Sequence, residues 1–260
     1  KSYWIRAMTP EGYIAWVTTG SIAHMNRAEY SAWMELPKLI VTAHYTLLRE
    51  SADDRSQIVS DAVMGNILAL EGISGSYFKV KIPNGKIAYL NRAHATYFES
   101  WLSSRNCNAD NIIETAKQFL GFPYMWGGTS VKALDCSGFT KTVFYMNGVI
   151  INRDASQQAL SGEEVDIENG FDNLQKGDLL FFGTKATEGR RERITHVGIY
   201  IENGSFIHSA TSVRINSLIE GAPDYYDGSG RMLRARRYLN HIDKDNQIVS
   251  IKNHPWYFKQ

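Results

Sequence analysis

The stretch Asp135-Cys136-Ser137-Gly138-Phe139 lies where a glycine-containing loop gives way to a helical run that continues over residues 139–146. A thiol at the start of a helix is next to the partial positive charge of the helix N-terminus, which lowers the pKa of the thiol and favours the thiolate. The sequence therefore predicts a nucleophilic Cys136. The alternative is a buried structural cysteine, a common fate of a lone Cys.

Two histidines supply the partners that such a nucleophile needs. A thiolate needs a general base, and the base needs a group that holds its ring. His196 begins a predicted strand at 196–201, and His208 lies in a predicted strand at 205–209. Glu202-Asn203-Gly204 is a hairpin signal, so both imidazoles are expected on one face of adjacent antiparallel strands. His196 is then the base, and His208 fixes its tautomer and orientation.

The pattern around these residues predicts an α+β domain. Asp110 is expected to cap a helix that Gly121 ends. Strands are expected at 178–182, 196–201 and 205–209. Helices followed by an antiparallel sheet are typical of this class. The apolar positions of the helix, which follow the 3.6-residue period, are Ile112, Ile113, Ala116, Phe119 and Leu120.

Composition excludes several classes of protein. The chain has 260 residues, 43% hydrophobic and 21% charged, which is ordinary for a soluble globular protein. A formal net charge of +1 gives no sign of a nucleic-acid or membrane-surface partner, and no apolar run approaches the roughly 20 residues that span a bilayer. With Cys107 and Cys136 alone, a disulfide scaffold is not expected. No Cys or His pair has the spacing of a zinc site, and no metal or organic cofactor is expected.

Residues 1–100 show short strands separated by turns, which suggests small β-barrels. Pro83-Asn84-Gly85-Lys86 joins two alternating segments as a hairpin. Gly12-Tyr13-Ile14-Ala15-Trp16-Val17 and Gly85-Lys86-Ile87-Ala88-Tyr89-Leu90 look like two copies of one strand, and in this the region resembles bacterial SH3-like domains. The resemblance implies the end of a first SH3-like domain at 1–20, a helical connector at 21–37 and a second SH3-like domain at 38–100.

Five motifs occur in a fixed order in the second half of the chain: Tyr124-Met125-Trp126-Gly127-Gly128, Asp135-Cys136-Ser137-Gly138-Phe139, Lys176-Gly177-Asp178-Leu179, His196-Val197-Gly198-Ile199-Tyr200 and His208. Over residues 105–240 the chain thereby resembles the NlpC family of cell-wall cysteine peptidases. The resemblance implies a papain-like fold and hydrolysis of peptide bonds in murein stem peptides. It matches Cys136 to the nucleophile, His196 to the base and His208 to the third member of the triad.

The resemblance also assigns a role to Tyr124. It matches a tyrosine near the nucleophile, whose hydroxyl would stabilise the oxyanion together with the backbone N–H of Cys136. The alternative is packing of Tyr124 beside Trp126. Residues 241–260 form a C-terminal extension without a motif, and its Trp256-Tyr257-Phe258 is expected to pack back onto a domain.

SH3-like domains in front of the peptidase domain make the chain similar to a narrower branch. Its members are dipeptidyl-peptidases that cleave γ-D-glutamyl-diamino acid bonds in stem peptides with a free N-terminal L-alanine. Asp135 and Ser137 match substrate-recognition positions of this branch, and Trp126 matches an aromatic wall of the pocket. A free ammonium needs an anionic partner, which Asp135 would supply. The alternative for Asp135 is the N-cap of the helix that follows.

Two further residues are candidates for substrate binding. An SH3-like domain of this branch closes the pocket and places a tyrosine near the substrate amine, and Tyr13 is the candidate. The segment Arg153-Asp154-Ala155-Ser156-Gln157-Gln158 resembles a family segment with Ser two places after the Arg. That place is Ala155 here, so the neighbouring Ser156 is the candidate for the substrate hydrogen bond.

Three other functions are compatible with the sequence. One is a wall-peptide-binding protein, against which the complete Cys-His-His set argues. The second is transfer of the acyl group to an amine or lipid, and the third is endopeptidase action on intact, glycan-linked peptidoglycan. The sequence favours the cell envelope over the cytoplasm, although no targeting segment is visible. It does not distinguish diaminopimelate from lysine in the substrate, and it does not give the oligomeric state.

Overall fold

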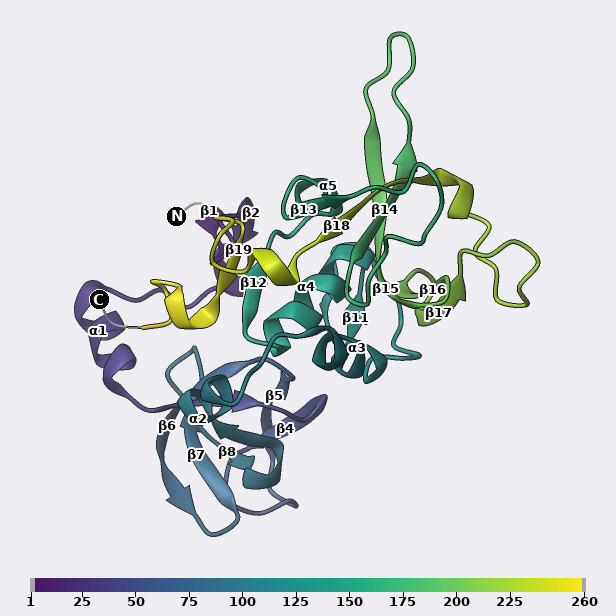
Figure 1. Cartoon of the computed structure of the whole chain (residues 1–260). Coiled ribbons are helices and arrows are strands. Elements are labelled where there is room, and N and C mark those ends of the chain that lie inside the picture. Colours follow the sequence, from purple (N-terminus) through teal and green to yellow (C-terminus); the bar gives the residue numbers. More distant parts are fainter. Residues whose placement is uncertain (1–2, 259–260) are drawn as a thin grey trace. The chain divides into compact units, whose positions relative to one another are not determined.

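The computed structural model describes residues 3–258 and divides the chain into two compact units (Figure 1). Unit 1 comprises Lys1–Arg105 together with Pro255–Gln260, and unit 2 comprises Asn106–His254. Within residues 3–258, no helix is long and apolar enough to cross a membrane. The Cys-His-His set predicted from the sequence lies entirely in unit 2.

Unit 1 begins with an antiparallel hairpin and a short helix. Asn26 caps the helix through a capping box: its side chain accepts a hydrogen bond from the N–H of Glu29, and the Glu29 carboxylate accepts one from the N–H of Asn26. The segment predicted as a helical connector thus contains a helix of nine residues. The elements are β1 (Trp4–Met8), β2 (Ile14–Thr18), a 3-10 helix (Thr19–Ser21) and α1 (Arg27–Glu35).

Seven antiparallel strands form the rest of unit 1, in the order β5-β4-β8-β7-β6-β3-β9. All seven contribute buried side chains to one apolar cluster, so the sheet curls around a single core. The turn at 83–86 joins β7 to β8 as a hairpin, as predicted, and Phe78 lies opposite Leu90 in it. The strands are β3 (Lys38–Val41), β4 (Tyr45–Arg49), β5 (Ile58–Val63), β6 (Ile67–Ser74), β7 (Tyr77–Lys81), β8 (Ile87–Asn91) and β9 (Ala95–Tyr97); a 3-10 turn (Arg92–His94) precedes β9.

The end of the chain packs on the helix that follows this sheet, α2 (Phe98–Ser103). The Phe98 ring stacks on Tyr257 with the centroids 6.1 Å apart, and the Phe258 ring lies 6.3 Å from it. The predicted packing of the C-terminal aromatic residues onto a domain is therefore confirmed, and that domain is unit 1.

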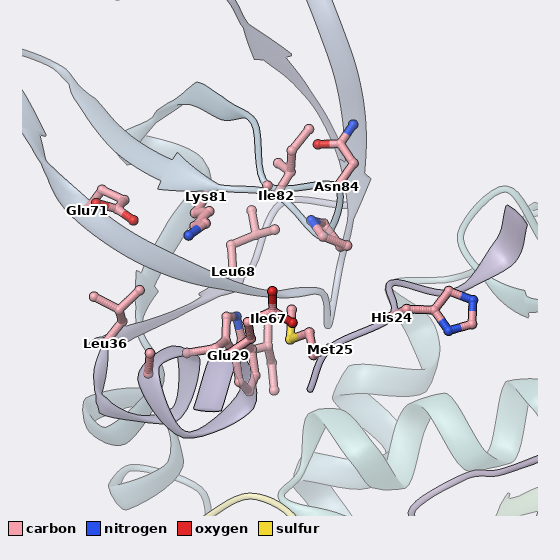
Figure 2. Close-up of a pocket in the computed structure, with 14 residues that line it drawn as sticks. His24, Met25, Glu29, Leu36, Ile67, Leu68, Glu71, Lys81, Ile82 and Asn84 are labelled. Atoms are coloured by element: carbon pink, nitrogen blue, oxygen red, sulfur yellow. The ribbon is translucent and has the colours of Figure 1, made fainter. Parts of the chain in front are cut away.

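A pocket of about 620 Å³ lies in unit 1 between α1 and the strands β6 and β7 (Figure 2). Its lining is largely apolar, and the charged residues in it are Glu29 on α1, Glu71 on β6 and Lys81 on β7. No cysteine lines it, so this pocket has no nucleophile of the predicted kind. Its apolar lining includes Met25, Trp33, Leu36, Ile67, Leu68 and Ile82.

Unit 2 packs helices against a six-stranded antiparallel sheet of order β13-β18-β14-β15-β16-β17. The central helix α4 (Cys136–Met146) packs against β15 (Arg193–Glu202) and β16 (Ser205–Ser209), which carry His196 and His208 (Figure 1). The α+β class is confirmed. The remaining elements are α3 (Ala109–Lys117), β10 (Thr129–Ser130), β11 (Ala133–Leu134), β12 (Val149–Ile151), α5 (Ala155–Gln158), β13 (Glu163–Val165), β14 (Leu179–Thr184), β17 (Val213–Ser217), β18 (Met232–Arg237) and β19 (Ile248–Ser250), with 3-10 turns at Ser229–Arg231, Leu239–His241 and Ile251–Asn253.

Three expectations for unit 2 need correction. The cap of α3 is Asn108, whose side chain accepts from the N–H of Asn111, and Asp110 lies inside the first turn. Leu120 follows the helix and is 45% exposed, because α3 ends at Lys117. The sheet has six strands where three were expected. The missed strands are β13, β17 and β18: β13 has three residues, and β17 and β18 each carry only two or three apolar residues, which is a weak strand signal in sequence.

Candidate active site

The loop before α4 packs closely against the first turn of that helix. Asp135 is the N-cap, and its Oδ1 accepts a hydrogen bond from the N–H of Gly138 at 2.6 Å. The N–H of Asp135 donates to the carbonyl oxygen of Gly128 at 3.0 Å, and a Cβ on Gly138 would lie only 2.0 Å from that oxygen. Glycine at 138 therefore permits the close approach that fixes Cys136 at the first position of α4.

The thiol of Cys136 is buried, with 7% of the residue exposed. Burial raises the pKa of Cys136 and the Asp135 carboxylate raises it further, whereas the backbone N–H groups of Val197, Ser137 and Cys136 act in the opposite direction. The expectation of a lowered pKa is therefore wrong for the resting protein. The helix N-terminus is present, but desolvation of the thiolate outweighs it.

The two histidines contact each other across adjacent strands. Gly198 on β15 pairs with His208 on β16, which places His196, two residues before Gly198, on the same face as His208. His196 Nε2 lies 2.6 Å from His208 Nδ1. The predicted contact between the rings is present. The N–H of Val197, the residue after His196, lies at the Cys136 thiol, so the thiol is close to the part of β15 that carries His196.

Asn216, on β17, fixes the tautomers of both rings. Its Nδ2 donates to the carbonyl oxygen of Asp224 at 2.7 Å, so its Oδ1 faces His208 Nε2 at 2.9 Å. His208 must then donate from Nε2 and accept at Nδ1, and the proton between the rings belongs to His196 Nε2. Nδ1 of His196 is left with a lone pair, which is the form that a general base requires.

Both rings are neutral in the resting protein. Burial lowers the pKa of His196 to about 3, and the charges of His208, Arg231 and Arg214 act in the same direction. Burial lowers the pKa of His208 to about 4, partly offset by its hydrogen bond to Asn216. The Cys136 thiol and both imidazoles therefore rest uncharged, and the thiol must lose its proton before it can act as a thiolate.

Tyr124 lies close to Cys136. Burial raises the pKa of Tyr124, and a negative charge on Cys136 raises it further, which places the phenol within electrostatic reach of the sulfur. The backbone N–H of Tyr124 donates to the carbonyl oxygen of Thr211 at 3.1 Å, which holds this loop against unit 2. Trp126 is 86% exposed, and in the described part of the chain no ring contact joins it to Tyr124. The alternative of packing beside Trp126 is thus not what the structure shows.

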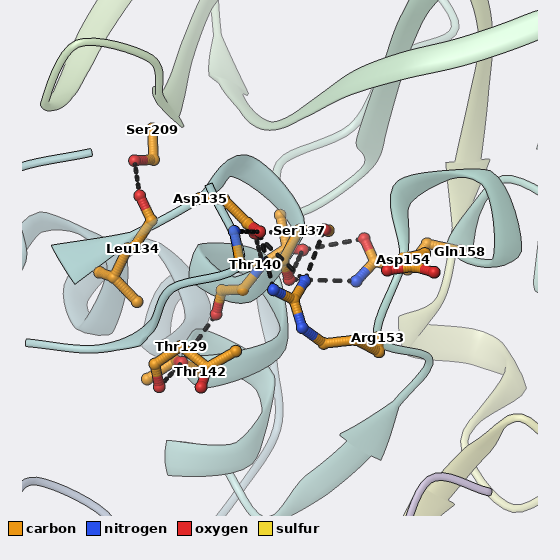
Figure 3. Close-up of polar contacts among 12 residues, drawn as sticks. Thr129, Leu134, Asp135, Ser137, Thr140, Thr142, Arg153, Asp154, Gln158 and Ser209 are labelled. Carbon is orange, nitrogen blue, oxygen red and sulfur yellow. Dashed lines mark hydrogen bonds and ion pairs between the residues drawn. The ribbon is translucent and has the colours of Figure 1, made fainter. Parts of the chain in front are cut away.

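Asp135 and Ser137 take part in a buried network centred on Arg153 (Figure 3). Arg153 pairs with both carboxylate oxygens of Asp135, at 3.2 and 2.7 Å, and donates to Ser137 Oγ at 3.0 Å. Gly127 N–H donates to Asp135 Oδ2 at 2.8 Å, and Gln158 Nε2 donates to the carbonyl oxygen of Ser137 at 3.2 Å. The Asp135 carboxylate thus already accepts from Arg153, Ser137 and two backbone groups, and the capping alternative for this residue is confirmed.

Tyr226, an aromatic neighbour of both histidines, is not among the residues that the sequence predicts at the site. Its ring lies 5.9 Å from that of His196 and 5.0 Å from that of His208. A negative charge on Cys136 raises the pKa of Tyr226, after burial, so the phenol also lies near the sulfur. Tyr226 belongs to a long connection between strands that has no motif, which is why no sequence signal marks it.

The remaining predicted residues are on α5 and in unit 1. Ser156 is exposed on α5, and Ala155 before it is buried. Tyr13 precedes β2 in unit 1, and its role at the pocket stays a prediction. Cys107 is a free thiol whose pKa burial raises to about 12. In residues 3–258 no group of three or more His, Cys, Asp and Glu side chains could hold a metal ion.

Comparison with known proteins identifies the family. The profile of the NlpC/P60 family matches residues 121–229. A gamma-D-glutamyl-L-lysine dipeptidyl-peptidase of Bacillus cereus is 34% identical over 250 residues, covering 92% of this chain and 71% of that protein. A protein of the same name from Bacillus subtilis is 37% identical over 157 residues, covering 59% of this chain and 49% of that protein.

A solved structure supports the same assignment for the fold. The crystal structure of an NlpC/P60 family protein from Bacillus cereus superposes with a TM-score of 0.72 at 32% identity, covering 92% of this chain and 77% of that one. The match includes the β-rich N-terminal region as well as the unit that carries Cys136. The chain therefore belongs to the NlpC/P60 family and is a cysteine-type hydrolase with a papain-like fold.

Proposed function

We propose that this chain hydrolyses the γ-D-glutamyl-diamino acid bond of murein stem peptides, with Cys136 as nucleophile, His196 as base and His208 as the residue that orients the base. Hydrolysis of cell-wall peptides is the coarser activity that follows from membership of the NlpC/P60 family. The observation that carries the roles of these three residues is the chain of hydrogen bonds from Asn216 through His208 to His196, close to the Cys136 thiol through the N–H of Val197 and the ring of Tyr226.

The first stage is acylation of Cys136. His196 Nδ1 takes the thiol proton as the sulfur attacks the γ-glutamyl carbonyl carbon. The charge that develops on the carbonyl oxygen is stabilised by the backbone N–H of Cys136 and by the hydroxyl of Tyr124. His196 then gives its proton to the leaving amine, and the carbon–nitrogen bond breaks to leave a thioester on Cys136.

The second stage is hydrolysis of this thioester. A water molecule loses its proton to His196 Nδ1 and attacks the thioester carbonyl, and the thiol is released with the proton restored. Throughout both stages His208 accepts from His196 Nε2 and holds the ring in one orientation. The imidazolium that forms transiently is stabilised by this hydrogen bond.

The choice of bond rests on similarity to the two relatives named for gamma-D-glutamyl-L-lysine dipeptidyl-peptidase activity. We extend it to stem peptides with a free N-terminal L-alanine. Asp135 is the predicted partner of that ammonium, and Trp126, Ser137, Ser156 and Tyr13 are the other predicted substrate contacts. A substrate ammonium at Asp135 would join a carboxylate that Arg153 and two backbone groups already occupy, so this contact is the first to test.

The test uses L-Ala-γ-D-Glu-L-Lys and L-Ala-γ-D-Glu-diaminopimelate, each free and N-acetylated, with products identified by mass spectrometry. We expect release of L-Ala-D-Glu from the free peptides only. Cys136→Ala should abolish cleavage, and Cys107→Ala, which removes the other thiol, should leave it unchanged. Equal cleavage of acetylated peptides would remove the requirement for a free amine. Binding without any cleavage would point to a wall-peptide-binding protein instead.

A further inference from the structure

The connection between β17 and the Ser229–Arg231 turn folds back onto the histidine face. Ser217 N–H donates to the carbonyl oxygen of Asp224, and Tyr226 N–H donates to the carbonyl oxygen of Ser217, both at 2.9 Å. These bonds bring the Tyr226 ring to His196 and His208. Gly228 packs beneath the ring, because a Cβ at this position would lie 2.6 Å from Tyr226 Cζ. The phenol is therefore held at the site by the backbone.

Two arginines flank this tyrosine. Arg214 lies directly opposite His208 in the β16–β17 pair, so the two side chains share a face of the sheet. Arg231 ends the 3-10 turn and interacts with the Tyr226 hydroxyl. Both arginines are exposed. The sulfur, the two imidazoles and two guanidinium groups thus converge around the Tyr226 ring.

Neither arginine has a carboxylate partner among residues 3–258. Most arginines elsewhere in the sheet and around α4 do have one. Arg153 pairs with Asp135, and the other pairs are Arg234 with Glu192, Arg236 with Glu164 and Arg237 with Asp178. The exceptions outside the site lie on the exposed β14–β15 hairpin, Arg191 among them. Two unpaired guanidinium groups beside a catalytic base form a place where an anion would be bound.

We propose that Arg231 and Arg214, together with the Tyr226 hydroxyl, bind the free α-carboxylate of the diamino acid that leaves in the reaction. This inference rests on the proposed function. His196 must protonate the leaving α-amine, so that nitrogen lies next to the imidazole during acylation. The α-carboxylate is attached to the carbon that bears the same nitrogen. The side chains that pack around His196 are therefore the ones that this carboxylate meets.

The consequence is a preference for peptides that end at the diamino acid. In a tripeptide the α-carboxylate is free and carries a negative charge. In a longer stem peptide, or in a C-terminal amide, the same group is a neutral amide that cannot form a bidentate ion pair with arginine. The two arginines would thus distinguish trimmed peptides from longer ones at the leaving-group side.

The experiment compares L-Ala-γ-D-Glu-L-Lys with its C-terminal amide. For the wild-type protein we expect kcat/KM to be about tenfold or more higher for the acid, since one charge-assisted pair is typically of this size. Arg231→Gln should lower kcat/KM for the acid to near the value for the amide and leave the amide unaffected; Arg214→Gln should act in the same direction. Arg191→Gln, an exposed arginine without an ion pair, is the matched control and should change neither value.

Other outcomes overturn the inference, and they are distinguishable from failure of the proposed function. If the wild-type protein cleaves acid and amide equally, the carboxylate site is absent although the peptidase stands. If Arg231→Gln lowers both values equally, Arg231 supports the site without reading the carboxylate. If neither peptide is cleaved, the proposed function fails and this inference falls with it. Binding of the two peptides to Cys136→Ala, measured by calorimetry, should show the same preference for the acid.

Discussion

Lowering the pH should destabilise unit 2 through its two buried imidazoles. The pKa of His196 is about 3 and that of His208 about 4 in the folded protein, whereas both are near 6.5 when the chain is unfolded. Between pH 6.5 and these folded values the unfolded chain binds more protons than the folded one, so stability falls as the pH falls. The stabilisation is fully present above pH 6.5 and is lost as the pH approaches 4 and then 3.

The size of the effect follows from these values. Each ring contributes a slope of about 1.4 kcal/mol per pH unit inside its window, or nearly twice that for the pair. At pH 5 the loss relative to pH 8 is about 2 kcal/mol for each ring and about 4 kcal/mol for both. This is a large fraction of the stability of a typical domain.

The two cysteines provide an assay that is specific for unit 2. Cys107 and Cys136 both lie in this unit, Cys136 buried and Cys107 partly so, and the chain has no other thiol. A short pulse of a dithiodipyridine reagent across a urea series should therefore report the free energy of unfolding of unit 2, at pH 8 and at pH 5. The matched variant is His196→Gln/His208→Gln. It will be less stable overall, but its loss between pH 8 and pH 5 should be smaller by about 4 kcal/mol. An equal loss in both proteins would refute the reasoning.

Three further predictions concern single side chains. In a Cys107→Ala background, the rate of alkylation of Cys136 by iodoacetamide should keep rising above pH 8, since burial raises the pKa of this thiol. A rate that is constant from pH 5 upward would contradict an uncharged Cys136 thiol and His196 ring in the resting protein. Asn216→Leu should lower kcat by about 100-fold with little change in KM, because His208 loses the acceptor that sets its tautomer. Asn216→Asp keeps an acceptor and should lower kcat less. An effect on KM alone would contradict this role. Arg153→Gln should lower the free energy of unfolding of unit 2, measured by thiol protection, by about 3–5 kcal/mol, because the substitution leaves the Asp135 carboxylate buried without its cation. A loss within about 0.5 kcal/mol, as expected for an exposed arginine, would contradict this prediction.

The sequence predicted the residues that local patterns bring together. Cys136 follows a loop that leads into a helix. A tight hairpin connects the strands of His196 and His208, so the number of residues between the two histidines is enough to place both rings on one face of the sheet. The partners that complete the site come from longer connections. Asn216 and Tyr226 reach the histidines through β17 and the loop that follows it, and neither stands in a motif. Their positions depend on non-local pairing, which sequence periodicity does not report.

The charge state of the nucleophile shows a different limit. Position at a helix start predicts a lowered thiol pKa, and the N–H groups on which that prediction depends are present in the structure. Desolvation of the thiolate opposes the effect of these N–H groups on the thiol pKa. The size of the desolvation effect depends on how completely β15 and β16 cover α4, and no local sequence pattern reveals that coverage. The same reasoning applies to Asp135. Its position predicts a cap, but its pairing with Arg153 comes from a segment 18 residues further along the chain.

A neutral resting pair has a consequence for specificity. The backbone N–H groups that favour the thiolate include that of Cys136, the predicted oxyanion donor, and in the resting protein burial outweighs them. In the proposed mechanism a bound substrate changes this balance, because negative charge then moves from the sulfur to a carbonyl oxygen for which Tyr124 and the N–H of Cys136 are the predicted donors. The proton is transferred to His196 only as that charge develops. The thiol is therefore expected to be weakly reactive toward small electrophiles and strongly reactive toward a peptide that fills the site, so that selectivity and activation depend on the same contacts.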